Sequence, residues 1–265
     1  MQHFLIIVEG AHDIAFLGKV LKTLNFQEVK RVRELSSLME IFIPKNFPFV
    51  EDKLNIFNFI PFFYKKENKQ VVIVNANGES NILNKLDVIL SEFELNEIRE
   101  INQILIFADG DLKNKTEKIE SILDVDFSLK EFEFLKKEDL SRENPKVNIY
   151  NKFEIPLDYF IFPDNNSKGR LEDIILEAIG LSENDLLTSA GKFISEVSQN
   201  YRSSWSNSNS KEQKAKIGIV GNILMPGAGN TTLLYSNNIE WISVKHKNSI
   251  SSLEKLYSFL DEKFV

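Results

Sequence analysis

The sequence predicts an α/β fold, with a mainly parallel sheet, helices on both faces and a helical C-terminal appendage. Several short apolar runs end in acidic residues, and stretches with helical spacing of apolar residues follow them. Apolar runs of this length, flanked by helical patterns, are typical of strands buried in a parallel sheet. After Gly180 the strand-like runs become rare and helical spacing predominates. We therefore expect a core over residues 1–180 and an appendage over residues 181–265 that packs on it.

The composition sets limits on the class of protein. The chain has 265 residues, 43% hydrophobic content and 21 Phe, which suffices for a substantial core. It has no Cys, so disulfides and thiolate metal sites are excluded. Its net charge of −7 does not favour nucleic-acid binding through a broad basic face. No apolar run is long enough to cross a bilayer or to act as an export signal, so we expect no membrane partner and a cytoplasmic location.

Apolar runs predict the strands of the core, and stretches with helical spacing of apolar residues between them predict its helices. The first strand is expected over residues 4–8, and a helix over 11–24 presents Ile14, Leu17 and Leu21 on one face. We treat residues 26–70 as an insertion of uncertain structure. The other expected core elements are a helix over 32–43, a turn at 67–69 leading into a strand over 70–74, a helix over 81–90, a strand over 103–107, a helix over 115–123, a short strand over 132–135, a strand over 157–162 and a helix over 169–179.

The appendage is predicted to be helical. Gly180 is placed to cap the preceding helix at its C-terminus. The expected helices cover residues 185–197, 211–224 and 249–264, with a polar loop over 203–210 and a Gly-rich loop over 226–232. The Gly-rich loop lacks the Gly-Lys-Ser/Thr ending of a phosphate-binding loop, so we interpret it as a connection or a flap over the site.

Acidic residues gather directly after three of the predicted strands. In open α/β sheets, ligands bind at the carboxyl ends of the parallel strands. Carboxylates that lie close together repel each other and need protons or a cation. A cluster that offers only oxygen ligands suits Mg²⁺ or Mn²⁺. The predicted metal ligands are, in chain order, Glu9, Asp13, Asp109, Asp111, Asp164 and Glu172.

Spacing suggests different roles for these acids. Asp109 and Asp111 lie on the same side of an extended chain, because side chains alternate, so both can approach one ion. Glu9, one strand away, is placed to bridge to that ion or to act as a general base. Asp13 falls in a first helical turn, where a role as a helix cap is an equal alternative. Glu172 and Asp173 are about 100° apart on a helix, so we favour Glu172 as the ligand and expect Asp173 to cap or to pair with a base.

Three motifs support a family resemblance. Val8-Glu9-Gly10-x-x-Asp13 and Asp109-x-Asp111 resemble the TOPRIM fold, the metal-binding module of topoisomerases, bacterial primases, RNA-maturation nucleases and OLD-family nucleases. Phe162-Pro163-Asp164-Asn165-Asn166, with Gly169-x-Leu171-Glu172-Asp173, is similar to the signature of an uncharacterised bacterial TOPRIM-related family. The resemblance covers about residues 4–180. Asn114 stands where TOPRIM sequences often have Gly, and Asn tolerates the left-handed backbone that Gly permits.

The resemblance implies a divalent-metal-dependent phosphodiesterase or nuclease that acts on nucleic acid. Glu9, Asp109 and Asp111 would then be the catalytic residues, with Mg²⁺ or Mn²⁺ as the cofactor. The alternative is a catalytically silent TOPRIM-like binding or regulatory protein, such as a component of a defence system. The net acidic charge and the lack of a recognisable substrate-binding domain motivate this alternative. Because the sequence shows no ATPase segment, an ATPase or other partner subunit is a further expected partner.

Overall fold

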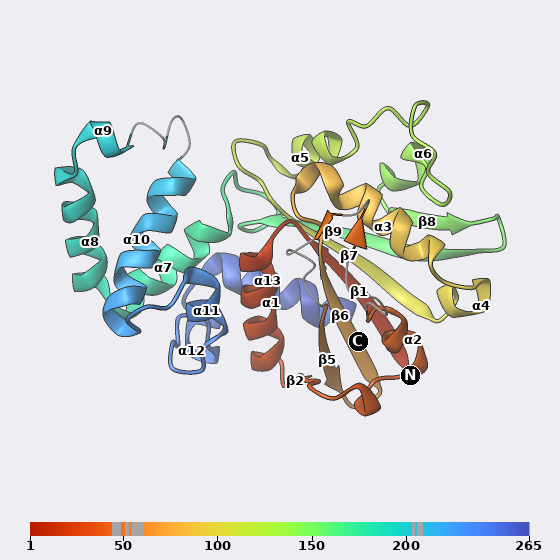
Figure 1. The fold of residues 1–265 in the computed structure, drawn as a ribbon, viewed down its shortest axis with the longest axis horizontal. Coiled ribbons are helices and arrows are strands. Elements are labelled where there is room, and N and C mark those ends of the chain that lie inside the picture. The colour runs from red at the N-terminus through yellow and green to blue at the C-terminus, as the bar shows by residue number, and fades with distance from the viewer. Residues whose placement is uncertain (44–48, 51–52, 55–60, 203–204, 206–208, 265) are drawn as a thin grey trace.

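A seven-stranded sheet forms the centre of the protein (Figure 1). The structure is a computed structural model that describes residues 1–43, 49–50, 53–54, 61–202, 205 and 209–264. The strand order is β2-β5-β6-β1-β7-β9-β8, and the four middle strands β6, β1, β7 and β9 are parallel. The strands are β1 (Gln2–Val8), β2 (Gln27–Glu28), β5 (Phe62–Lys66), β6 (Lys69–Asn75), β7 (Ile101–Asp109), β8 (Lys146–Ile149) and β9 (Phe153–Phe162), with β3 (Phe49–Val50) and β4 (Lys53–Leu54) as a separate antiparallel pair.

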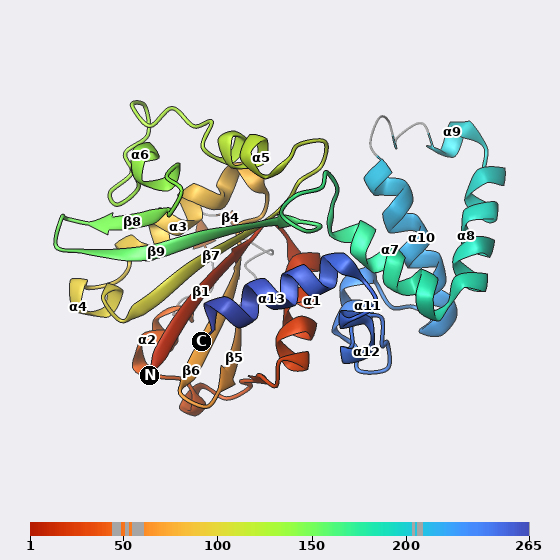
Figure 2. The same ribbon diagram turned by 180° about the vertical axis from the view of Figure 1, so that it is seen from behind.

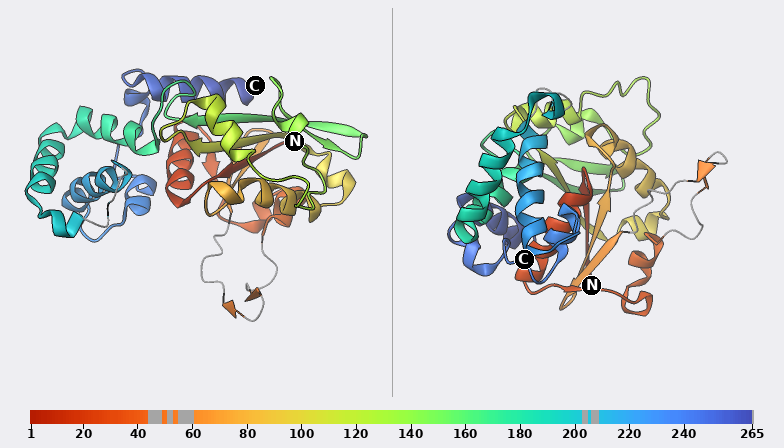
Figure 3. Two further views of the ribbon diagram at one scale, coloured as in Figure 1. Left: turned by 90° about the horizontal axis from the view of Figure 1, so that it is seen from above. Right: turned by 60° about the vertical axis from the view of Figure 1, so that its left-hand side comes forward.

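Helices cover both faces of the sheet, as the edge-on view in Figure 3 shows. The helices are α1 (Ala11–Thr23), α2 (Ser37–Ile41), α3 (Ile82–Ser91), α4 (Leu95–Ile98), α5 (Lys115–Ile122), α6 (Lys137–Leu140), α7 (Leu171–Ser182), α8 (Asn184–Glu196), α9 (Gln199–Arg202), α10 (Asn209–Leu224), α11 (Asn230–Tyr235), α12 (Val244–Lys247) and α13 (Ser251–Lys263), and there are short 3₁₀ turns η1 (Val32–Glu34) and η2 (Glu79–Asn81).

The side chains of each strand point alternately to the two faces of the sheet, and each face has its own apolar core. On β1, Phe4, Ile6 and Val8 belong to one core, which α1, α7, α11 and α13 complete. Leu5 and Ile7 belong to the other core, which α2, α3 and α4 complete. Successive side chains of a strand point to opposite faces, so a strand with apolar residues at every position is buried on both sides. This accounts for the continuous apolar runs of the sequence.

The C-terminal region departs from the sheet and then returns to it. Helices α8, α9 and α10 extend to one side of the sheet (Figure 1), whereas α13 runs back across it (Figure 2). The Phe264 ring meets the Phe4 ring edge-on at 4.9 Å between centroids, and the Phe259 and Phe160 centroids lie 5.2 Å apart. The chain after residue 180 therefore supplies part of the central core as well as an appendage.

The predicted fold class is confirmed, and several predicted elements are corrected. The prediction of one helix over 32–43 is wrong: η1 and α2 occupy this stretch, and Ser36 begins α2 by accepting a hydrogen bond from the Met39 amide at 3.4 Å. Residues 132–135 do not form a strand, and strand β8 was missed. Gly180 does not cap α7, which continues to Ser182.

Parts of two predicted segments lie outside the described residues. These are 44–48, 51–52 and 55–60 of the predicted insertion, and 203–204 and 206–208 of the predicted polar loop. The predicted turn at 67–69 lies within the described residues and joins β5 and β6 as an antiparallel hairpin. Among the helices of the described residues, none has both the length and the apolar character that crossing a bilayer requires.

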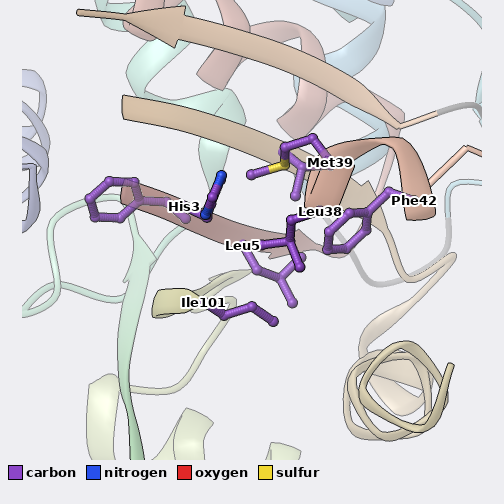
Figure 4. A pocket seen from close by; sticks show the side chains of 8 residues that line it. His3, Leu5, Leu38, Met39, Phe42 and Ile101 are labelled. Atoms are coloured by element: carbon purple, nitrogen blue, oxygen red, sulfur yellow. The ribbon is translucent and has the colours of Figure 1, made fainter. Parts of the chain in front are cut away.

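The packing under α2 is tight. Figure 4 shows His3 and Leu5 of β1 facing Leu38, Met39 and Phe42, and the hollow between them has no room for a water molecule. The buried His3 ring is held by the Ser36 hydroxyl at 2.9 Å and lies 3.2 Å from the Glu100 carbonyl oxygen. Burial lowers the pKa of His3, and the Glu100 carbonyl opposes this only in part. We assign this hollow a structural role.

Candidate functional site

The carboxyl ends of the parallel strands bring distant acidic residues to one edge of the sheet. Val8, the last residue of β1, lies beside Phe107 of β7, and Asp109 lies beside Phe162 of β9. Glu9 follows β1 directly, and its Oε1 accepts a hydrogen bond from the Asp109 backbone amide at 3.1 Å. Glu9 thus reaches the end of the neighbouring strand.

Asp13 turns back from α1 toward the same edge. Its Oδ2 accepts a hydrogen bond from the Gly10 amide at 2.7 Å, so it caps the first turn of α1. The side chain is almost fully buried. Burial raises the pKa of Asp13 well above its ordinary value, and the charges of Asp109 and Glu9 raise it further. Asp13 therefore interacts electrostatically with two acids at the ends of neighbouring strands.

Asp109 connects β7 to α7. Its Oδ1 accepts a hydrogen bond from the Leu171 amide at 2.8 Å, at the N-terminus of α7. Burial is the main cause that raises the pKa of Asp109 to about 7, and repulsion from Glu172 is the next. The pKa of Glu9 is also raised, chiefly by burial and against the opposing charge of Lys118.

Glu172 has only 3% of its surface exposed, and one of its oxygens lacks a partner. Its Oε1 lies 3.8 Å from His12 Nδ1 and 3.4 Å from Lys214 Nζ, whereas Oε2 makes no hydrogen bond. Burial acts to raise the pKa of Glu172, but His12 and Lys214 outweigh it and lower the pKa. We refer to Glu9, Asp13, Asp109 and Glu172 as the carboxylate cluster.

Asp111 lies beside this cluster but is paired with cations. Its Oδ1 accepts a hydrogen bond from Arg170 Nε, and its Oδ2 lies 3.3 Å from Lys118 Nζ. Burial acts to raise the pKa of Asp111, but Arg170 and Lys118 outweigh it and lower the pKa. The expectation of an extended chain from Asp109 to Asp111 is wrong, because β7 ends at Asp109 and Asp111 has a φ of 55°.

Lys118 is the functional candidate that sequence reasoning missed. Only 1% of its side chain is exposed, and its Nζ lies 2.9 Å from Glu79 and 3.5 Å from Glu9. Burial acts to lower the pKa of Lys118, but the surrounding carboxylates outweigh it and raise the pKa. A signal was present in the sequence: Lys118 precedes Ile122 by four residues, so it occupies the inward face of the helix.

Gly110 allows three backbone segments to meet at the site. Its amide donates to the Phe162 carbonyl at 3.0 Å, and the Asp111 amide donates to the Gly169 carbonyl at 2.7 Å. A Cβ atom at Gly110 would lie 2.7 Å from the Phe162 carbonyl oxygen. Only glycine fits this approach, which locks the end of β7 to the loop after β9.

The remaining predicted site residues have structural partners. Asp164 lies 2.6 Å from Lys255 Nζ and accepts hydrogen bonds from the amides of Asn166 and Ser167 at 3.0 and 2.6 Å. Asp173 caps α7 by accepting a hydrogen bond from the Arg170 amide at 2.7 Å.

Asn114 does not adopt the left-handed conformation that was expected. Its φ is −79°, and its side chain caps α5 by accepting a hydrogen bond from the Glu117 amide at 3.0 Å. The positive φ falls three residues earlier, at Asp111.

The donor set suits a hard cation in its chemistry. The cluster offers only carboxylate oxygens, Asp13 and Glu172 are buried, and Glu172 Oε2 has no partner. A divalent cation would offset the repulsion among these carboxylates and give Glu172 Oε2 a partner. In the part of the chain that the structure describes, however, no three Asp, Glu or His side chains form a ready-made metal site. Metal binding would therefore require rotation of at least one side chain.

The fold and the site together define a class: an α/β protein in which half-buried carboxylates at the carboxyl ends of parallel strands meet buried carboxylates from the following helices. A sequence-family model described as "Protein of unknown function (DUF3226)" matches residues 3–258. The chain therefore belongs to the DUF3226 family. No curated protein matches the sequence.

A solved structure has a similar fold. It is the crystal structure of hypothetical protein PH0156 from Pyrococcus horikoshii OT3, with a TM-score of 0.54 and 19% sequence identity over 99% of this chain and 95% of that chain. At this identity the likeness speaks for the fold alone.

Proposed function

We propose that this protein is a divalent-metal-dependent phosphodiesterase or nuclease of TOPRIM type that acts on nucleic acid. The observation that carries the proposal is the carboxylate cluster, in which a buried Glu172 oxygen has no partner. Buried carboxylates are costly unless a proton or a cation accompanies them. The proposal includes a cytoplasmic location and, where catalysis depends on one, an ATPase or other partner subunit.

Glu9 and Asp109 are the residues that we propose to hold the metal, with Asp13 and Glu172 completing the ligand set. When bound, Mg²⁺ or Mn²⁺ would neutralise charge on the phosphoryl group and orient the attacking water. Asp111 would act beside the metal, because it holds Arg170 and Lys118 close to the position that a phosphate would occupy.

Asp109 would serve as a ligand and not as a base. In the protein without metal, burial and the charge of Glu172 raise its pKa to about 7. A cation bound to its carboxylate would favour the ionised form. Because Oδ1 accepts the Leu171 amide proton, Oδ2 is the oxygen that would face the metal.

A cleavage assay tests the proposal. Single- and double-stranded DNA and RNA are incubated with Mg²⁺ or Mn²⁺ and with wild type, Asp109→Asn or Glu9→Gln. We expect metal-dependent cleavage by wild type and a loss of at least about 100-fold in either variant. Asp126→Asn is the matched control, because Asp126 bonds only within its own surface loop in the described contacts. Equal activity in wild type and Asp109→Asn on every substrate would refute the proposal.

A second candidate is the catalytically silent binding or regulatory protein, such as a defence-system component. Lys118 favours it, because its ammonium group already serves as a cation among Glu9, Glu79 and Asp111. Calorimetry with Mg²⁺ and Mn²⁺ separates the two candidates. Metal binding together with a rise in melting temperature supports the enzyme, and absence of binding supports the silent protein.

A further inference from the structure

We propose that the cavity between α1, β5 and α11 receives one nucleobase of a single-stranded substrate. This inference rests on the proposed function, since it assigns the class of substrate that reaches the carboxylate cluster. The cavity has a volume of about 320 Å³. Small-molecule sites range from about 300 to 1,000 Å³, so this cavity suits a single ring system with an attached sugar.

The walls of the cavity are mainly apolar and partly aromatic. Ala11, Ile14 and Ala15 form one wall on α1, and the rings of Phe62 and Tyr235 form another. These two rings meet at an angle of 66° with centroids 5.9 Å apart, so they present a corner to a ligand. A flat ring stacks on an aromatic face whatever the identity of the base.

Tyr235 is held in place before any ligand binds. Its hydroxyl donates a hydrogen bond to Glu28, and Lys22 Nζ lies 4.3 Å from the centre of its ring. A ring that is already fixed loses little freedom on binding, so its contacts contribute more to affinity.

Polar contacts come from one side of the cavity. Thr231 and Thr232, at the start of α11, contribute hydroxyl groups that both donate and accept hydrogen bonds. The edge of a nucleobase carries donors and acceptors next to an apolar face. None of the residues that line the cavity is Lys, Arg or His, so the cavity suits the base and leaves the phosphate outside it.

The cavity adjoins the carboxylate cluster along α1. Ala11 follows Glu9 by two residues, so their Cα atoms are at most about 7 Å apart. Ala11, Ile14 and Ala15 share one face of α1, whereas Asp13 points to another side of the helix, because successive residues are about 100° apart. A nucleotide with its base in the cavity would therefore have to pass over the N-terminus of α1 for its phosphate to reach the acids.

This arrangement predicts a preference for single strands. A base within a duplex is stacked and paired, and reaching the cavity would cost the energy of unstacking it. A base in a single strand or at a frayed end avoids most of that cost. The Gly-rich segment that sequence reasoning interpreted as a connection or flap thus leads into α11, which forms one side of the cavity.

A binding experiment without metal tests the cavity independently of catalysis. Calorimetry in EDTA compares adenosine 5′-monophosphate with ribose 5-phosphate, which has the same phosphate and sugar but no base. We expect the nucleotide to bind about 5-fold to 150-fold more tightly, the range that stacking of one base contributes. Equal affinity for the two probes would overturn the proposal.

Substitutions that fill the cavity test whether the nucleotide binds there. Thr231→Leu and Ala15→Leu add carbon atoms to its walls, and we expect both to remove the preference for the nucleotide. Thr188→Leu, at an exposed position of α8, is the matched control and should bind as wild type does. If the buried Ala15 variant fails to fold, Thr231→Leu on the half-buried start of α11 still decides the question. A preference retained in Thr231→Leu would overturn the assignment.

Three further outcomes separate this inference from the proposed function and from other ligands. Mn²⁺ binding should be unchanged in Thr231→Leu, because the cavity walls hold none of the acids. Nucleotide binding without any metal binding would support the cavity and refute the nuclease. Octyl glucoside carries an alkyl chain in place of a base, and its binding in the absence of nucleotide binding would show that the cavity takes aliphatic ligands instead.

Discussion

At the scale of single residues, Lys118 is the cation on which the site depends. Its ammonium group lies within 3.5 Å of three carboxylates, from Glu9, Glu79 and Asp111. A lysine with 1% exposure is stable as a cation only when such partners compensate for the loss of water. The partners remain partly exposed, which weakens each individual pair.

Lys118→Met is therefore expected to destabilise the protein. Loss of the ammonium leaves Glu9 and Glu79 without this cation, while Asp111 keeps Arg170. Removing one partner of a buried pair costs about 3–5 kcal/mol. Because the acids are partly exposed, we expect a decrease of about 3 kcal/mol in the free energy of unfolding in urea at pH 7. Lys113→Met, at an exposed lysine of the same region, should change it by less than about 0.5 kcal/mol. Equal effects of the two substitutions would contradict this role.

Asp109 links stability to pH. Burial and the charge of Glu172 raise its folded-state pKa from 3.8 to about 7. Between these two values the unfolded chain releases the proton while the folded protein keeps it, so the free energy of unfolding falls as pH rises. The contribution that is present below about pH 4 is lost by about pH 7, and it is on the order of 4 kcal/mol.

Asp109→Asn is expected to remove this pH dependence. The variant keeps an acceptor for the Leu171 amide but cannot ionise. In EDTA, its stability relative to wild type should grow as pH rises from 4 to 8 and reach a few kcal/mol. Urea denaturation at several pH values measures the difference. A constant difference across this range would show that Asp109 titrates normally.

At the scale of elements, the turn after β7 fixes the geometry of the site. The prediction from sequence placed Asp109 and Asp111 on one side of an extended strand. Instead, Gly110 packs against the Phe162 carbonyl and Asp111 adopts a positive φ. These contacts direct Asp109 toward α7 and Asp111 toward Arg170. The turn therefore divides two neighbouring acids between two different environments.

Two glycine substitutions test the importance of this turn. Gly110→Ala would place a Cβ atom 2.7 Å from the Phe162 carbonyl oxygen and 3.2 Å from two other carbonyls. All three contacts are backbone atoms, so we expect a loss of about 3 kcal/mol of stability. Gly191→Ala, within α8, meets no atom within 4 Å and should stabilise the protein by about 0.5–1 kcal/mol. Thermal unfolding of both variants measures the contrast, which a harmless Gly110→Ala would contradict.

At the scale of the whole molecule, the last helix of the chain, α13, covers one face of the central sheet. Leu253, Leu256 and Leu260 of α13 are fully buried in the core that contains Phe4 and Phe107. Burial of each such side chain contributes about 1.5–3 kcal/mol. The sum of these contributions is comparable with the whole free energy of unfolding of a typical protein, about 5–15 kcal/mol.

A chain that ends at residue 248 should therefore lose cooperative folding. Without α13, one face of the sheet would expose the Phe4, Phe107 and Phe160 rings to water. We expect no cooperative thermal transition by circular dichroism, and partial recovery when a peptide of residues 249–264 is added. A sharp transition in the truncated chain would show that α13 is dispensable for cooperative folding.

The sequence by itself determined the class of fold and the edge of the sheet where the acids gather. Continuous apolar runs specify buried parallel strands, and parallel strands necessarily end at one edge. Asp173 as a helix cap and the antiparallel turn at 67–69 were also predictable, because caps and turns depend on a few neighbouring residues.

Only the tertiary structure decided which acids meet one another. Asp164 lies at the carboxyl end of a parallel strand, as Glu9 and Asp109 do, yet it pairs with Lys255 from α13, some 90 residues away. Lys118 and Arg170 reach Asp111 from two different elements. Spacing along a chain specifies which face a residue occupies, but partners from distant segments determine its charge state, because electrostatic interactions act through space.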